Sequence, residues 1–235
     1  MATYKITHWL LLLPLLILPA CGGSPEKTRM NLAKKEIQRM GLKVTNEAFL
    51  ESSAKGKGQA VDLFLAAGFD PDTRDRFGQT PAMFAAMNGH TSIVRVLAEK
   101  GALMDAKNAK GGTALMFAAL NGHAQTAEVI LRRGANVDLE TRDGYTALMA
   151  ASEKGHVEVV RTLTLSGGDL DIQDRHDQTA LMHAAVNGHR DIVAWLIDQG
   201  ADIHAESARG GTALSVARAN DHMDVVELLQ AAGAK

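Results

Sequence analysis

The 235-residue chain has few aromatic residues, a single cysteine and almost no net charge. Aromatic residues make up only 4% of the sequence, which argues against nucleic-acid modules that stack bases on aromatic side chains. The formal net charge of −2 gives no indication of a phosphate-binding surface. We therefore expect no nucleic-acid partner.

Long apolar runs are also lacking, apart from one near the N-terminus. Lys5 precedes residues 10–18, which are almost all leucine and far fewer than the ~20 residues that span a bilayer. A positive charge followed by a short apolar run is typical of a targeting segment that does not join the fold. The next residues, Leu-Pro-Ala-Cys-Gly at 18–22, resemble the bacterial lipoprotein signal.

This resemblance implies a lipoprotein signal peptide over residues 1–20 and a lipid on Cys21, which becomes the mature N-terminus. Gly22 rather than Asp follows the cysteine, which implies an outer-membrane location facing the periplasm. The alternative is an ordinary secretory signal with an incidental cysteine, but one unpaired thiol would be unusual in a secreted protein. Polar residues 21–30 predict a flexible tether, so we expect membrane contact only through the lipid.

The rest of the chain repeats itself every 33 residues without insertion. Three residue types mark the period: Thr80, Thr113, Thr146, Thr179 and Thr212; His90, His123, His156, His189 and His222; Gly101, Gly134, Gly167, Gly200 and Gly233. A fixed period of this length is the sequence mark of a solenoid, in which each unit packs on its neighbours.

One unit can be interpreted from its residues alone. Thr80 is a good N-cap and Pro81 suits the first helical position, which predicts a helix over 81–88. Apolar residues at helical spacing predict a second helix over 91–100. Residues 102–110 lack such spacing and predict an extended turn. Neither helix could bury its apolar face without an adjacent unit.

The first-helix motif, Thr-Ala-Leu-Met at 113–116, 146–149 and 179–182, resembles the Thr-Pro-Leu-His of the ankyrin repeat. The resemblance implies an all-α repeat solenoid, an ankyrin-repeat array in which each helix-turn-helix is followed by an extended turn finger. Methionine replaces the motif histidine, so we expect the array to depend more on packing. The predicted units are an N-terminal helix and degenerate capping repeat at 31–77, repeats at 78–110, 111–143, 144–176 and 177–209, and a C-terminal capping repeat at 210–235.

The N-terminal unit has its own expected cap. Asn31 is predicted to begin a helix that runs to Met40, with Gly41 closing it.

The histidine series does not predict a metal site. Stacked helices lie about 8–10 Å apart, whereas two imidazole nitrogens on one zinc ion must lie within roughly 4 Å of each other. We expect each histidine to begin the second helix and tie the turn by hydrogen bonds. The sequence has no Gly-x-Ser-x-Gly motif and no Cys/His or Ser/His/Asp set. We therefore predict no catalytic residues, metal or cofactor, and no enzyme activity.

A partner surface is expected on the concave face, which repeat stacks use for binding. We predict a protein-contact patch of large apolar side chains with a basic rim. The patch residues are Phe84, Met87, Phe117, Leu120 and Tyr145, and the rim residues are Arg74, Arg76, Lys107 and Lys110. The alternative is that these side chains only pack between adjacent first helices and fingers.

These expectations combine into a lipid-anchored periplasmic protein–protein interaction module, monomeric, with another protein as its partner. By resemblance to bacterial ankyrin proteins linked to catalases and oxidative stress, it would be a scaffold or accessory factor for an envelope or periplasmic protein. The alternative is an inhibitor or immunity protein that occludes a toxin or enzyme active site with its concave face. An enzyme or transport component is a third reading. Mixed charge on the predicted face does not separate the first two.

Overall fold

A threonine begins the first helix of every complete repeat. The Oγ1 atom of Thr80 accepts a hydrogen bond from the backbone N–H of Met83 at 3.4 Å. The equivalent bond is made by Thr113, Thr146, Thr179 and Thr212. Each side chain satisfies a backbone donor that the helix itself leaves free. The predicted N-caps are therefore confirmed.

The computed structural model describes residues 24–235, which form thirteen α-helices and no strands. After the N-terminal helix α2, the helices come in pairs. The first helices are α3 (Asn46–Ala54), α5 (Pro81–Met87), α7 (Ala114–Leu120), α9 (Ala147–Lys154), α11 (Ala180–Val186) and α13 (Ala213–Ala219). The second helices are α4 (Gly58–Ala66), α6 (Thr91–Glu99), α8 (Ala124–Arg132), α10 (Val157–Leu165), α12 (Arg190–Asp198) and α14 (Met223–Ala231).

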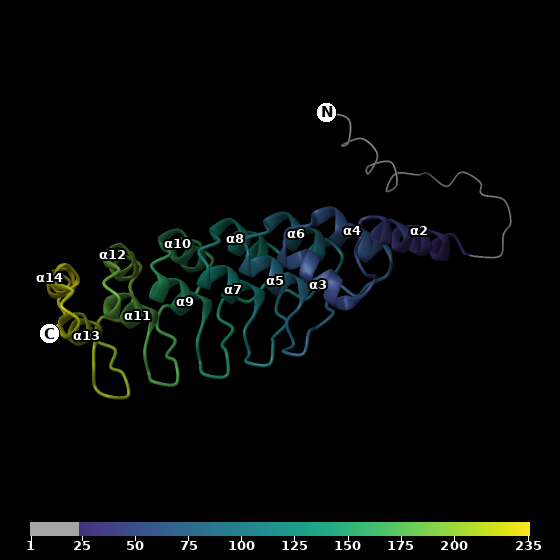
Figure 1. Cartoon of the computed structure of the whole chain (residues 1–235). Helices are drawn as coiled ribbons and strands as arrows, with labels where there is room; N and C mark the ends of the chain where they lie inside the picture. Colours follow the sequence, from purple (N-terminus) through teal and green to yellow (C-terminus); the bar gives the residue numbers. More distant parts are fainter. Residues whose placement is uncertain (1–23) are drawn as a thin grey trace, which may run out of the picture.

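The pairs stack side by side into an elongated array, which confirms the predicted all-α repeat fold. Figure 1 shows first and second helices in two rows, with the connecting loops extending from the first-helix side as a row of fingers. Neighbouring fingers are joined by backbone hydrogen bonds, such as that from the N–H of Ala109 to the carbonyl of Phe77 at 2.9 Å. The same bond recurs from Arg142 to Lys110 at 3.1 Å.

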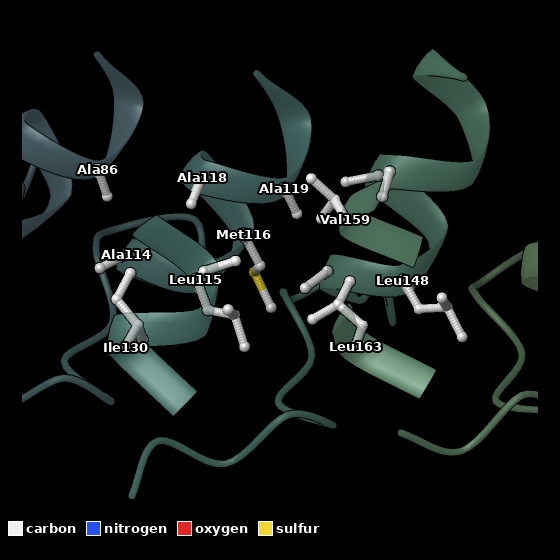
Figure 2. Packing of buried hydrophobic residues seen from close by; sticks show 14 of the residues in the cluster. Ala86, Ala114, Leu115, Met116, Ala118, Ala119, Ile130, Leu148, Val159 and Leu163 are labelled. Carbon is white, nitrogen blue, oxygen red and sulfur yellow. The ribbon is translucent and has the colours of Figure 1, made fainter. Parts of the chain in front are cut away.

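The core lies between the two rows and continues through the stack. Alanines on the first helices, such as Ala118 and Ala119, are fully buried and let the larger side chains of neighbouring helices approach. Figure 2 shows Ala118 and Ala119 of α7 together with Ile130 of α8 and Leu163 of α10, which all belong to this core. Met116, which occupies the position of the motif histidine, is buried as well. The core is therefore shared between repeats, as the solenoid prediction requires.

Histidines join each repeat to the one before it. The Nε2 atom of His123 lies 3.1 Å from the carbonyl oxygen of Met87, 36 residues earlier. The other four bonds, at 2.9–3.1 Å, join His90 to Ala54, His156 to Leu120, His189 to Glu153 and His222 to Val186. Each histidine is also the residue that precedes its second helix. The predicted structural role is confirmed, and the tie runs to the preceding repeat.

A glycine makes room for each of these imidazoles. Gly122 has a φ of +74°, and a Cβ atom there would lie 2.7 Å from Nδ1 of His156. Glycine adopts this left-handed conformation without steric cost and leaves the space that the ring occupies. The recurrent glycine thus serves both the helix stop and the contact between repeats.

The N-terminal helix begins earlier than the sequence predicts. Helix α2 spans Pro25–Arg39, and the Oγ atom of Ser24 accepts the N–H of Lys27 at 3.3 Å. Ser24 is therefore the cap, and proline takes the first helical position. The expected cap at Asn31 is wrong, as is the expected tether over residues 25–30. Residues 1–23, including the predicted signal peptide, Cys21 and the start of the tether, lie outside the described residues.

Helix α2 is part of the fold because its apolar face packs on α4, at the N-terminal end of the array (Figure 1). Ala33 and Ile37 are buried in this contact. Within residues 24–235, no helix is both long enough and apolar enough to cross a membrane.

Candidate protein-binding surface

Two columns of first-helix side chains face the fingers. The first column consists of Phe84, Phe117, Ala150, His183 and Val216, and the second of Met87, Leu120, Glu153, Val186 and Ala219. Their orientation follows from the bonds of His183 to Asp174 in a finger and of Glu153 to Tyr145 at a finger base. We call the surface formed by these columns and the fingers the finger-side face.

The first two complete repeats make this face apolar. Phe84 and Met87 on α5 and Phe117 on the neighbouring α7 are half-buried, and Leu120 is 38% exposed. The aromatic rings are thus neither free in solvent nor fully packed between helices. Phe77, outside the predicted patch, is 53% exposed at the first fingertip, where later repeats have charged or polar residues. The structure brings four of the five predicted patch residues together on adjacent helices.

The basic rim also braces the fingers. The Nη1 atom of Arg74 donates to the carbonyl oxygen of Lys107 at 2.8 Å, and Nζ of Lys107 donates to the carbonyl oxygen of Glu140 at 2.8 Å. The guanidinium of Arg76 lies 4.6 Å from the centre of the Phe77 ring, within the range of a cation–π contact. Lys110, at the second fingertip, is exposed. The rim is therefore positively charged, and hydrogen bonds or a ring contact hold Arg74, Lys107 and Arg76 in position.

The next two repeats make the face polar. The hydroxyl of Tyr145 donates to the carboxylate of Glu153, and the Tyr145 ring meets the His183 ring edge-on at a centroid distance of 5.4 Å. The Nε2 atom of His183 lies 3.1 Å from Oδ2 of Asp174. The other oxygen of Asp174 accepts the backbone N–H of Gln178 at 3.0 Å, which holds the carboxylate in its finger. These groups form one network between α9, α11 and their fingers.

The network shifts the pKa values of two of its members. Burial, with the hydrogen bond and negative charge of Glu153, raises the pKa of Tyr145 above its usual value. Burial acts to raise the pKa of Glu153 too, but hydrogen bonds from Lys154 and Tyr145 outweigh it and lower that pKa. At neutral pH Tyr145 is therefore a hydrogen-bond donor and Glu153 is ionised.

Tyr145 accordingly does not join the apolar patch in the way the sequence predicts. Its ring is half-buried and its hydroxyl is engaged with Glu153. The sequence indicates this network in one way: Glu153 and His183 are polar, whereas the matching positions of the other repeats are apolar or alanine.

Exposed apolar side chains also occur between the second helices. Leu103 is 62% exposed beside an open groove of about 460 Å³ between the loops that follow α6 and α8. Leu165 is 72% exposed beside a groove of about 410 Å³ between α8 and α10. Arginines 132 and 133 line these grooves, and the two leucines lie in different ones. This surface lacks the contiguous apolar group seen on the finger-side face.

The histidines of the array are engaged in hydrogen bonds rather than gathered around an ion. Among residues 24–235, no three His, Cys, Asp or Glu side chains converge so as to hold a metal. The absence of catalytic residues and cofactors remains a prediction from the sequence.

Comparison with known proteins identifies the family. A family model described as ankyrin repeats in three copies matches residues 49–141, 104–174, 130–207 and 148–235, which together cover residues 49–235. The chain belongs to the ankyrin-repeat family. Arrays of this family are protein–protein interaction modules.

Two curated relatives share short stretches with the chain, and both are named ankyrin repeat, SAM and basic leucine zipper domain-containing protein 1. The protein from Echinops telfairi is 40% identical over 57 residues, which are 24% of this chain and 12% of that protein. The protein from Equus caballus is 33% identical over 70 residues, or 30% of this chain and 15% of that protein. The matched segments thus span a small part of these relatives, and the likeness is to their ankyrin repeats.

Proposed function

We propose that this chain is an envelope protein acylated at Cys21, whose ankyrin array binds another protein through the finger-side face and performs no chemistry itself. The observation that carries the binding site is the contiguous, partly exposed apolar group of Phe84, Met87, Phe117 and Leu120. Apolar clusters of this kind with a basic rim are suited to protein contact, since aromatic and arginine side chains supply much of interface energy.

The proposed location rests on the sequence around Cys21. The Leu-Pro-Ala-Cys-Gly motif supports acylation, and Gly22 supports the periplasmic side of the outer membrane. There the array would serve as a scaffold or accessory factor for an envelope or periplasmic protein, a stress-related enzyme such as a catalase being one candidate.

The second candidate function is an inhibitor or immunity protein. The exposed Asp177 on a finger favours it, because negative charge on the binding face suits a basic catalytic cleft. The carboxylates of Asp143 and Glu153 are already paired, with Arg175 at 2.9 Å and with Lys154 at 2.7 Å. The two functions differ in what happens to the partner: an inhibitor abolishes the activity of the protein it binds, whereas a scaffold leaves that activity in place.

The binding proposal is tested by affinity purification of the tagged mature chain from its native envelope, beside two variants. Phe117→Asp places a charge in the apolar group, and Leu165→Asp places one on an exposed site between second helices. We expect one partner to be retained by wild type and Leu165→Asp and lost from Phe117→Asp. Equal retention by both variants would remove the finger-side face as the binding site. Assaying the purified partner with and without added chain then separates scaffold from inhibitor.

The anchor is tested separately by growing cells with a radiolabelled fatty acid. Label should attach to the wild-type chain and not to Cys21→Ser. An unlabelled wild-type chain would refute acylation without affecting the binding surface.

A further inference from the structure

Positive charge is concentrated at the N-terminal end of the array. Residues 24–57 contain eight Lys and Arg against four Asp and Glu, whereas residues 58–235 contain sixteen against twenty-three. The near-neutral total thus hides an N-terminal unit with a net charge of +4 and a remainder with −7. A separation of this size gives the two parts different affinities for anionic surfaces.

The outward face of α2 carries two of these basic residues beside an exposed apolar one. Ala33 and Ile37 point into the core, so residues at the opposite helical positions point away from the array. Those residues are Thr28, Leu32, Lys35 and Arg39, all of them exposed, while the exposed Arg29 lies at the edge of the buried face, four residues before Ala33. Leu32 is 49% exposed, and the Arg39 side chain is 77% exposed even though it pairs with Glu36 at 3.1 Å.

Basic side chains near an anionic membrane are each attracted to the lipid phosphates by about 1 kcal/mol, and the neighbouring leucine can enter the membrane interface. The position of α2 agrees with this. Only residues 22–24 separate Cys21 from the helix, so an extended chain carries Pro25 at most about 14 Å from Cys21. The Debye length at physiological salt is about 8 Å, so a lipid on Cys21 would hold the first turn of the helix within about two Debye lengths of the surface charge.

We propose that the outward face of α2 docks on an anionic phospholipid surface, as a second contact beside the lipid on Cys21; the placement in the cell rests on the proposed anchor. Helix α2 packs on the second-helix row, whereas the fingers project from the first-helix row (Figure 1). Docking through α2 therefore leaves the finger-side face open to a protein partner. It also stabilises the attachment, because two weak membrane contacts on one chain reinforce each other.

The test uses the mature chain, residues 21–235 with Cys21→Ser, so that no acyl group contributes to binding. Its sedimentation is measured with phosphatidylcholine vesicles and with vesicles that also contain phosphatidylglycerol. We expect binding only when phosphatidylglycerol is present, and we expect it to weaken as salt is raised. Reversing two charges in Lys35→Glu/Arg39→Glu should weaken binding by about tenfold or more. Leu32→Ser should weaken it at every salt concentration.

The matched control is Arg209→Glu/Arg218→Glu, which changes the net charge equally at the C-terminal end of the array. It should bind as the parent does, and circular dichroism should show that all variants are folded, since every substituted residue is exposed. Absence of vesicle binding at low salt, equal binding to both vesicle types, or equal losses in the two charge-reversed variants would each overturn the proposal. Because the fatty-acid experiment uses the wild-type chain in cells, failure of the anchor and failure of docking are distinguished.

Discussion

The hydroxyl of Tyr145 donates a hydrogen bond to the carboxylate of Glu153, eight residues later in the chain. The pair spans the base of a finger and the end of α9, and it lies beside the His183–Asp174 contact of the next repeat. A position that the sequence assigns to an apolar patch is thereby turned into a polar one. The finger-side face changes character between its second and third complete repeats as a result.

This pair predicts an alkaline titration. Burial and Glu153 raise the folded-state pKa of Tyr145 above the usual value of about 10. The stability that this contributes is fully present below about pH 10 and is lost as the pH rises through the folded-state pKa. In residues 21–235 Tyr145 is the only tyrosine, so phenolate absorbance reports it directly. We expect ionisation well above pH 10 in the native chain and a lower midpoint in Glu153→Gln. A midpoint near 10 in the folded wild type would contradict the assignment.

The contact between His123 and Met87 predicts a measurable loss of stability in His123→Ala. The substitution removes a hydrogen bond between repeats, so the free energy of unfolding should fall by about 1 kcal/mol or more. Urea unfolding measures it. His204→Ala is the control, because His204 is exposed outside the repeating series, and its effect should stay within about 0.5 kcal/mol. Similar losses in both variants would mean that the imidazole ties contribute nothing.

Gly122 and Gly134 predict a difference between two alanine substitutions. Both glycines have a positive φ, +74° and +85°, so alanine is strained at either by roughly 1 kcal/mol. At Gly122 the new methyl would also meet the His156 ring at 2.7 Å, whereas nothing lies within 4 Å at Gly134. Gly122→Ala should therefore destabilise the chain more. In a His156→Ala background that excess should disappear, and its persistence in a double-mutant cycle would exclude the ring as the cause.

Ser152 predicts a stabilising substitution. Its side chain is fully buried, and its hydroxyl has no hydrogen-bond partner among the described residues. The matching positions in neighbouring repeats are alanine. Ser152→Ala should raise the free energy of unfolding by up to about 1 kcal/mol, because it removes an unpaired buried polar group. Ser53→Ala is the comparison: that hydroxyl donates to the carbonyl of Phe49 at 3.0 Å, so no gain is expected. A loss at Ser152 would indicate a partner such as a bound water.

Much of the fold can be predicted from the sequence, because the residues that determine it act locally and recur in every repeat. Thr80 and Pro81 mark a helix start by their own chemistry, and the constant 33-residue spacing requires every unit to meet its neighbours in the same way. The start of α2 differs from the prediction, although Ser24, Pro25 and Glu26 form a helix-start signal. The polar composition of residues 21–30 predicts a tether, but composition alone does not distinguish a tether from an exposed helix with a good cap.

The candidate binding surface can be predicted only in part from the sequence, because it depends on which side chains of different repeats contact one another. The columns that contain Phe84 and Phe117 follow from helical spacing, but their half-burial depends on how closely α5 and α7 stack. The network of Tyr145 and His183 joins residues far apart in the sequence through particular rotamers. Periodicity places such residues on one face and does not say whether they pair with each other.

The imidazole hydrogen bonds all run in the same direction along the stack. Each histidine ring bonds to a carbonyl of the preceding repeat. Removing the last repeat would therefore leave the carbonyl of Val186 without its bond to His222. Removing the first repeat would leave the ring of His90 without its bond to the carbonyl of Ala54, and it would expose the end of the stack that α2 and α4 cover. A unit lost from either end therefore breaks one imidazole bond and uncovers an apolar face that it had buried, so each terminal repeat protects its neighbour.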